Sequence, residues 1–267
     1  MIEVDRVSKS YGRARVVDDV SVVIPKGGVT AIIGPNGAGK STLLSIMARL
    51  VPMDAGRVRV DGLDVTTTKG DVLARRLAVL RQDNHLAARL TVRDLVAFGR
   101  YPHSKGRPTA EDARHIERAV ERLGLQGLED RFLDELSGGQ RQRAFVAMAL
   151  CQDTDYLLLD EPLNSLDMKR AAEMMALVRH TADTRGTTVV VVLHDINFAS
   201  CYADRIVAMR DGRIAFEGTP EELMRKEVLA AIYDMDIAIH AIDGRLFGAY
   251  HLPQEKRPAT GAIPAGD

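Results

Sequence analysis

The chain has 267 residues, a formal net charge of −1 at pH 7 and 46% hydrophobic residues. This apolar content excludes disorder of the whole chain, because burying it can outweigh the entropy cost of folding. The balanced charge argues against a broad nucleic-acid-binding face. Two cysteines, Cys151 and Cys201, are too few for a disulfide framework. The length suits one large domain, or one domain with an inserted subdomain.

The hydrophobic runs in the chain are short. The most apolar run covers residues 189–193, whereas a helix needs roughly 20 apolar residues to span a bilayer. Residues 1–12 lack the basic, apolar and small-residue pattern of a signal peptide. We therefore expect that the chain itself does not cross a membrane, although a partner could hold it at one.

The pattern of apolar residues changes twice along the chain. The first third favours β-structure, because glycine and proline separate short β-branched segments. The middle has apolar residues at helical spacing, which predicts a helical insertion into an α/β frame, and strand and helix signals then alternate again. The expected strands are residues 2–7, 20–24, 29–33, 58–60, 78–80, 156–159, 188–193, 206–209 and 213–217, and the expected helices are residues 40–50, 92–99, 111–123, 139–151, 169–184 and one that opens at Pro220 after a Thr219 cap.

A glycine-rich segment between an expected strand and an expected helix has the composition of a phosphate-binding loop. Residues 34–41, GPNGAGKS, fit the pattern GxxxxGK[ST] at every position. Glycines allow backbone N–H groups to surround an anion, and the helix N-terminus adds a positive partial charge. Lys40 can then reach terminal phosphates, and the Ser41 hydroxyl can bind Mg2+. The alternative is a glycine-rich turn that binds nothing.

Two adjacent carboxylates end the expected strand at residues 156–159. Ligands of doubly wound sheets bind at the carboxyl ends of strands, so Asp160 could hold Mg2+ and Glu161 could polarise an attacking water. Two acids here would repel each other unless a cation lies nearby. A solvated strand end is the alternative, and it becomes the weaker interpretation once Lys40 and Ser41 are considered.

Residues 136–140, LSGGQ, lie between these two segments. Ser137 and Gln140 have the spacing of a capping box, which predicts a helix start. A capping box does not require Gly138 and Gly139, however. The two glycines would expose the helix N-terminus to close approach by an anion, and both interpretations can hold together.

Together these motifs resemble the ATP-binding subunits of ABC transporters. The segments GPNGAGKST at 34–42, LSGGQ at 136–140 and YLLLDEP at 156–162 occur in that family's order and approximate spacing, and the resemblance covers about residues 1–250. Four weaker marks agree with it. They are Tyr11 at the place of the adenine-stacking aromatic, Gln82 at that of the Q-loop glutamine, residues 165–167 at that of the D-loop and His194 at that of the switch histidine.

Each weaker mark has a structural alternative. Tyr11 could be a surface turn residue, Gln82 an exposed loop residue and His194 a structural histidine at a strand end. Asp167 could cap the helix that follows it, which is compatible with a functional role.

The resemblance implies an α/β fold, namely a P-loop NTPase core of the ABC-ATPase type with an N-terminal antiparallel β subdomain and an inserted helical subdomain. We assign residues 1–82 and 153–252 to the nucleotide-binding core, and residues 83–152 to the helical subdomain that carries the signature. Residues 253–267 are rich in proline, glycine and alanine and are expected to form a flexible tail.

The resemblance also implies ATP and Mg2+ as cofactors, and a head-to-tail pair of copies with two ATP molecules between them. Residues 137–139 of one copy would close over the γ-phosphate that the other copy holds. Glu161 would orient or deprotonate water, His194 would bridge to the γ-phosphate or hold Glu161, and Gln82 would contact the metal and the water. The expected nucleotide contacts are Tyr11, Gly34, Pro35, Asn36, Gly37, Ala38, Gly39, Lys40, Ser41, Thr42, Ser137, Gly138, Gly139, Gln140 and Asp167, and the expected metal contacts are Ser41, Gln82 and Asp160.

A chain without a membrane-spanning segment has no permeation path of its own. The resemblance therefore implies a pair of integral membrane permease subunits, with residues 83–103 as the candidate contact, and indirectly a substrate-binding protein. It implies a peripheral location on the cytoplasmic face of a bacterial membrane and no nucleic-acid partner. For residues 83–103, a plain solvated loop is the alternative.

Three segments narrow the transporter class. Residues 96–103 (VAFGRYPH) and 194–199 (HDINFA) look like the corresponding parts of ATPases that drive import of ferric siderophores, haem or cobalamin. Residues 160–168 (DEPLNSLDM) depart from the family's commonest form, which has Thr after Pro, and are similar to a subset that serves iron–siderophore uptake. We therefore expect the ATPase of a ferric-siderophore importer.

Other classes stay open as alternatives. They are the ATPase subunit of a transporter for haem, cobalamin or an amino acid, an exporter subunit, a non-transport ABC ATPase, and an ATP-binding regulatory module that does not hydrolyse. The balanced charge opposes a nucleic-acid partner. The presence of Glu161 and His194 opposes a module without hydrolysis.

Overall fold

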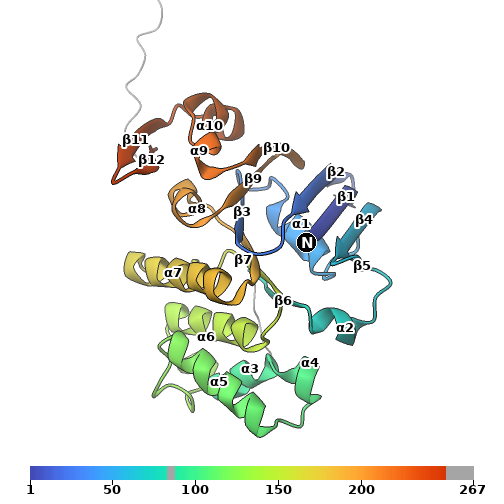
Figure 1. Ribbon diagram of the computed structural model, residues 1–267, viewed down its shortest axis with the longest axis vertical. Coiled ribbons are helices and arrows are strands. Elements are labelled where there is room, and N and C mark those ends of the chain that lie inside the picture. Colours follow the sequence, from blue (N-terminus) through green and yellow to red (C-terminus); the bar gives the residue numbers. More distant parts are fainter. Residues whose placement is uncertain (83–87, 251–267) are drawn as a thin grey trace, which may run out of the picture.

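The computed structural model describes residues 1–82 and 88–250, which form an antiparallel sheet, a largely parallel sheet, a small hairpin and a set of helices. Figure 1 shows the parallel sheet in the middle of the molecule, with the antiparallel sheet to one side and a helical region below. This arrangement confirms the expected α/β fold with an N-terminal antiparallel β subdomain and inserted helices.

The central sheet places the carboxyl ends of its parallel strands along one edge. Its strand order is β10-β9-β3-β8-β7-β6, and all neighbouring pairs except β9–β10 are parallel. Every residue of β3, β7 and β8 is buried, as expected for strands covered on both faces. The bounds are β3 Val29–Ile33, β6 Leu77–Leu80, β7 Tyr156–Asp160, β8 Thr188–Val192, β9 Arg205–Arg210 and β10 Arg213–Gly218.

The antiparallel sheet covers one face of the central sheet through a shared helix. Its strands are β1 (Ile2–Tyr11), β2 (Ala14–Ile24), β4 (Ala55–Val60) and β5 (Leu63–Asp64), in the order β2-β1-β4-β5. Helix α1 (Lys40–Met47) lies between the two sheets (Figure 1), and its leucines share one apolar core with residues of both. Helix α1 is therefore held between the two sheets by apolar contacts with both.

The opposite face of the central sheet packs on helices. A second apolar core joins this face to α7 (Met168–Arg185), α8 (Ile196–Tyr202), α9 (Pro220–Leu223) and α10 (Lys226–Tyr233). The same core continues into the helical region. That region comprises α3 (Val92–Phe98), α4 (Tyr101–Ser104), α5 (Ala110–Arg122), the 3-10 turn Leu133–Glu135 and α6 (Gly138–Cys151), and a short helix α2 (Gly70–Ala74) precedes β6.

Most expected elements are present, with shifted ends. The helix expected over 40–50 ends at Met47, and the Thr219 cap is confirmed as a capping box. The hairpin of β11 (Ala238–Ile242) and β12 (Arg245–Ala249) was not expected, nor were the short helices α2, α4 and α8 and the helix α10. Residues 83–87 of the candidate permease contact and the expected tail, 253–267, lie outside the described residues.

A buried ion pair joins three elements of the helical region. Arg100 Nε donates to Asp112 Oδ1 at 2.8 Å, and an Arg100 amino group also donates to the carbonyl of Cys151 at 3.1 Å. Both charged side chains are less than a tenth exposed. The other oxygen of Asp112 accepts the Thr109 N–H in the capping box of α5. Asp112 therefore neutralises a buried charge and also caps a helix.

We predict that Asp112→Ala lowers the free energy of unfolding by about 3 kcal/mol, because it leaves a buried guanidinium unpaired. The Thr109 hydrogen bonds and Arg100 lower the pKa of Asp112 to about 2. A carboxyl with a lowered folded pKa stabilises above its unfolded pKa of about 4, and this stability is lost as the pH falls through about 2. Urea unfolding across this pH range measures both effects.

The matched control is Glu117→Ala, on the exposed face of the same helix. This variant is expected to stay within about 0.5 kcal/mol of the parent protein. Equal stability of the Asp112→Ala and Glu117→Ala variants would contradict the role given to the buried pair.

Candidate functional site

The loop between β3 and α1 forms a cradle of backbone groups. The backbone φ angles of Gly34, Gly37 and Gly39 are 138°, 79° and 98°, and residues other than glycine rarely adopt such values. A Cβ at Gly34 would lie 2.0 Å from the Met209 carbonyl oxygen, and one at Gly39 would lie 2.3 Å from that of Val16. Close backbone packing thus requires glycine at positions 34 and 39, whereas Gly37 is favoured by its φ angle alone.

Lys40, the first residue of α1, is folded back over the cradle. Its Nζ donates to the carbonyl oxygens of Gly34 and Pro35, both at 2.9 Å, and the residue is only 4% exposed. Burial lowers the pKa of Lys40, and the nearby Glu161 and Asp160 oppose this shift. A buried ammonium with carbonyl partners can move to phosphate oxygens when these are present.

The adjacent carboxylates lie at the end of β7, where the sequence places them. Both Asp160 and Glu161 are buried. The Ser41 hydroxyl donates to Asp160 Oδ1 at 2.8 Å. Burial raises the pKa of Asp160, Glu161 adds to this shift, and the Ser41 hydrogen bond and Lys40 oppose it. The ammonium group of Lys40 therefore supplies the positive charge that two neighbouring carboxylates require.

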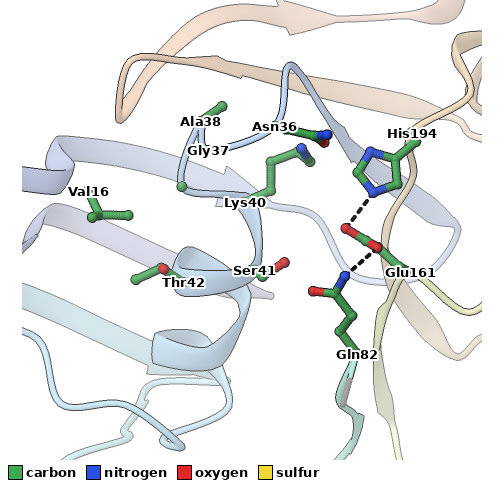
Figure 2. A pocket seen from close by; sticks show the side chains of 11 residues that line it. Val16, Asn36, Gly37, Ala38, Lys40, Ser41, Thr42, Gln82, Glu161 and His194 are labelled. Atoms are coloured by element: carbon green, nitrogen blue, oxygen red, sulfur yellow. Dashed lines mark hydrogen bonds and ion pairs between the residues drawn. The ribbon is translucent and has the colours of Figure 1, made fainter. Parts of the chain in front are cut away.

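Three donors surround the carboxylate of Glu161. His194 Nε2 lies 2.5 Å from Oε1, while Gln82 Nε2 and Asn164 Nδ2 each donate to Oε2 at 2.7 Å. Figure 2 shows Gln82 and His194 converging on Glu161 from two sides. Glu161 also has a φ of +51°, a backbone conformation that a bulky residue adopts only where its surroundings impose it. The carboxylate is therefore fixed in place.

Most of these residues line one cavity of about 370 Å³ (Figure 2). The cavity is polar on one side, where Glu161, Gln82 and His194 meet Lys40, and it is bounded by the backbone of the cradle. Its lining residues are Val16, Asn36, Gly37, Ala38, Gly39, Lys40, Ser41, Thr42, Gln82, Glu161 and His194. The structure thus brings together the cradle and the expected catalytic residues, which come from distant parts of the chain.

The signature residues are not among the residues that line this cavity. Ser137 caps α6 and forms the expected capping box with Gln140. A Cβ at Gly138 would lie 3.4 Å from that of Ser165, so the signature lies beside the segment before α7. Asp167 caps α7 by accepting the Arg170 N–H at 2.8 Å. These caps confirm the structural interpretations of the motif, and at the helix start Gly138 is exposed while Gly139 is half-buried.

Tyr11 also lies outside the cavity lining. Its ring is 51% exposed near the end of β1, and Lys9 Nζ is 5.6 Å from its centroid. Sequence reasoning missed two neighbours of the site, Val16 and Asn164. No pattern marks Val16, and Asn164 reaches Glu161 only because the chain turns sharply after β7, as the hydrogen bond from the Asn164 N–H to the Glu161 carbonyl shows.

Comparison with known proteins decides the family. Residues 17–164 match the family model described as ABC transporter. The chain belongs to the ABC transporter family. As an ABC ATPase it binds and hydrolyses ATP, and among the described residues no helix is long and apolar enough to cross a membrane.

Individual relatives support this assignment over nearly the whole chain. The ABC ATPase is 52% identical over 250 residues to the petrobactin import ATP-binding protein YclP of Bacillus subtilis, covering 94% of this chain and 99% of that protein. It is 40% identical over 233 residues to the ferric enterobactin transport ATP-binding protein FepC of Escherichia coli, covering 86% of each. Among solved structures, a dimeric post-hydrolysis state of the ATP-binding cassette MJ0796 with ADP and Pi matches with a TM-score of 0.76 at 28% identity, covering 82% of this chain and 99% of that one.

We predict that Lys40→Ala weakens ATP binding roughly 30-fold or more, about 2 kcal/mol, because a buried charged donor is removed. Titration with a fluorescent ATP analogue measures the affinity, and a thermal melt confirms folding. Lys69→Ala, at an exposed lysine, serves as the control and should bind ATP as the parent does. Unchanged nucleotide binding by Lys40→Ala would contradict the cradle assignment.

Proposed function

We propose that this ABC ATPase drives import of a ferric siderophore by hydrolysing ATP in the cavity between the cradle and Glu161. The observation that carries the hydrolytic part is the convergence of Lys40, Ser41, Glu161 and His194 on one cavity. The cargo rests on similarity to siderophore import proteins along nearly the full chain.

The phosphates of ATP would occupy the cradle formed by residues 34–42. The N–H groups of the loop and the N-terminus of α1 favour negative charge there, and Lys40 would exchange its carbonyl partners for terminal phosphate oxygens. Tyr11, whose ring is exposed, would stack on the adenine. These positions are the sequence-based assignment, and the cavity supports it for residues 36–42.

The donor set beside the cradle fits Mg2+. No group of three or more His, Cys, Asp and Glu side chains within residues 1–82 and 88–250 could hold a metal alone. Mg2+ is instead commonly held by one or two carboxylates together with phosphates and water. The Ser41 hydroxyl and the Asp160 carboxylate are such hard oxygen donors, and the Gln82 amide would add a third contact. When bound, the ion would neutralise charge on the phosphates.

Glu161 would orient the attacking water and accept its proton. A carboxylate is well suited to this task when it is buried and held by neighbouring donors. His194 would hold Glu161 Oε1 and bridge toward the γ-phosphate. Gln82, which donates to Glu161 Oε2, would contact the water. The transition state spreads negative charge over the transferring group, and Lys40 would offset part of it.

A second copy would complete the site. Ser137, Gly138 and Gly139, with Gln140 and Asp167, would face the γ-phosphate held by the partner copy in a two-fold arrangement. Gly138 is exposed at the start of α6, where the helix N-terminus favours an anion. Two matching solved structures of MJ0796 are dimers, which supports this arrangement.

Membrane permease subunits would contact the helical region near its junction with the core. Phe98 and Tyr101 are 52% and 56% exposed there, and exposed aromatic side chains of this size favour an interface. We propose the boundaries 1–82 and 153–252 for the core and 83–152 for the helical subdomain. The chain would lie at the cytoplasmic face of a bacterial membrane, and a substrate-binding protein would deliver the cargo.

Uptake of labelled iron chelates by iron-starved cells tests this proposal. One strain carries the parent chain and the other carries Glu161→Gln, with equal amounts of protein checked by immunoblot. The panel contains catecholate and hydroxamate siderophores, haem and cobalamin. We predict that uptake of one siderophore class falls by roughly 90% or more, because transport depends on hydrolysis and loss of the general base slows hydrolysis by about a hundredfold or more.

The other chelates of the panel are the internal control and should enter both strains equally. Selective loss of haem or cobalamin uptake would replace the siderophore by that cargo. No loss for any chelate would contradict the siderophore assignment, while the assignment of the chain as an ABC ATPase would stand.

A further inference from the structure

The hairpin of β11 and β12 is docked on α8, the helix that follows His194. Asn197 Oδ1 accepts the Gly248 N–H at 2.8 Å, and Asn197 Nδ2 donates to the Gly248 carbonyl at 3.2 Å. One side-chain amide thus satisfies both backbone groups of a residue in β12. Such a two-bond contact fixes direction as well as distance, because both groups must align at once.

Further contacts hold the same helix face. Ser200 Oγ donates to the Leu246 carbonyl at 3.0 Å, and the Arg245 guanidinium donates to the carbonyl of Cys201. Asn197, Ser200 and Cys201 have the i, i+3, i+4 spacing of one helix face. The hairpin therefore contacts α8 along most of its length, which Figure 1 shows on the side of α8 away from the antiparallel sheet.

Gly248 is required for this approach. A Cβ at this position would lie 2.7 Å from Ile196 Cδ1 and 3.1 Å from Ile237 Cγ2, and both isoleucines are buried. The Gly248 φ is outside the left-handed region, so the reason for glycine here is space. The absence of a side chain lets β12 reach the first turn of α8.

His194 lies between two anchors. On its N-terminal side, the Leu193 N–H donates to the Ile32 carbonyl of β3 at 3.0 Å. On its C-terminal side, Asp195 caps α8 by accepting the Asn197 N–H at 2.7 Å, and the Asn197 side chain binds Gly248. Displacing the start of α8 would therefore move the His194 backbone relative to Glu161, whose Oε1 is 2.5 Å from His194 Nε2.

Tyr250, the last residue that the structure describes, lies beside Asp195 at the start of α8. Burial raises the pKa of Tyr250 to about 12, and the Asp195 carboxylate beside it adds to the shift. Its phenol is therefore neutral at physiological pH and lies against the residue that caps α8. The hairpin thus contacts Asn197 through Gly248, and Tyr250, the residue after β12, lies beside Asp195.

We propose that Asn197 is a positioning residue for ATP hydrolysis and that, through it, the β11–β12 hairpin holds His194 at hydrogen-bonding distance from Glu161. The inference rests on the proposed role of His194 in hydrolysis. The β11–β12 hairpin would thus support hydrolysis indirectly, although none of its residues lines the cavity. Misplacement of a reacting group by about 1 Å can cost up to a hundredfold in rate.

The test compares Asn197→Ala with His240→Ala in the full-length protein. His240 is exposed on the same hairpin and serves as the control. We expect Asn197→Ala to lower kcat about tenfold, with KM for ATP and nucleotide affinity within about twofold, because the cradle is untouched. Gly248→Val, which keeps the Asn197 amide but pushes β12 away, should give the same pattern, and thermal melts confirm that each variant is folded.

A double-mutant cycle separates positioning from general stability. If Asn197 acts through His194, Asn197→Ala should have little further effect on kcat in a His194→Ala background. Single-turnover hydrolysis of radiolabelled ATP keeps these slow variants measurable. An unchanged kcat for Asn197→Ala, a matching rise in KM, or an undiminished loss in the His194→Ala background would each overturn the inference.

The His194→Ala variant alone distinguishes this failure from failure of the proposed function. Full activity of His194→Ala would remove His194 from hydrolysis and would overturn both. Low activity of His194→Ala with full activity of Asn197→Ala would overturn only the role of the hairpin.

Discussion

Two buried carboxylates in adjacent positions impose the strongest requirement on this molecule. Asp160 and Glu161 lie buried side by side at the end of β7, where burial and the neighbouring carboxylate raise the pKa of Asp160. The site meets this requirement with Lys40, with the Ser41 hydroxyl on Asp160 and with three donors around Glu161. Under the proposed function, a pair of acids held in this way would serve a metal ion through Asp160 and a water molecule through Glu161.

The order of the strands brings these groups together. The strands β3, β8 and β7 are neighbours and parallel, so the cradle after β3, His194 after β8 and the carboxylates after β7 all lie at one edge. Gln82 enters from the segment after β6, at the end of the same sheet. Cores on both faces fix this edge, and the helices of the second core carry the residues that would face a partner copy and a permease.

The parts of the site that depend on local patterns could be predicted from the sequence. The buried strands, the cradle glycines and the caps at Ser137 and Asp167 follow from residue types and spacing, and the structure confirms them. Asn164 could not be predicted, because its contact depends on the positive φ of Glu161. The docking of Asn197 on Gly248 joins residues about fifty positions apart. Asp243-Gly244 did carry a hairpin signal, which exposed and weakly patterned flanking strands obscured.

The central claim is that Glu161 performs chemistry in a site that two copies complete around ATP. Sedimentation velocity of Glu161→Gln with and without ATP and Mg2+, together with the rate of phosphate release, tests it most directly. The account predicts that the variant binds ATP, doubles its mass when ATP is added and loses at least about a hundredfold in hydrolysis. Near-normal hydrolysis, or a variant that binds ATP and stays monomeric, would contradict it.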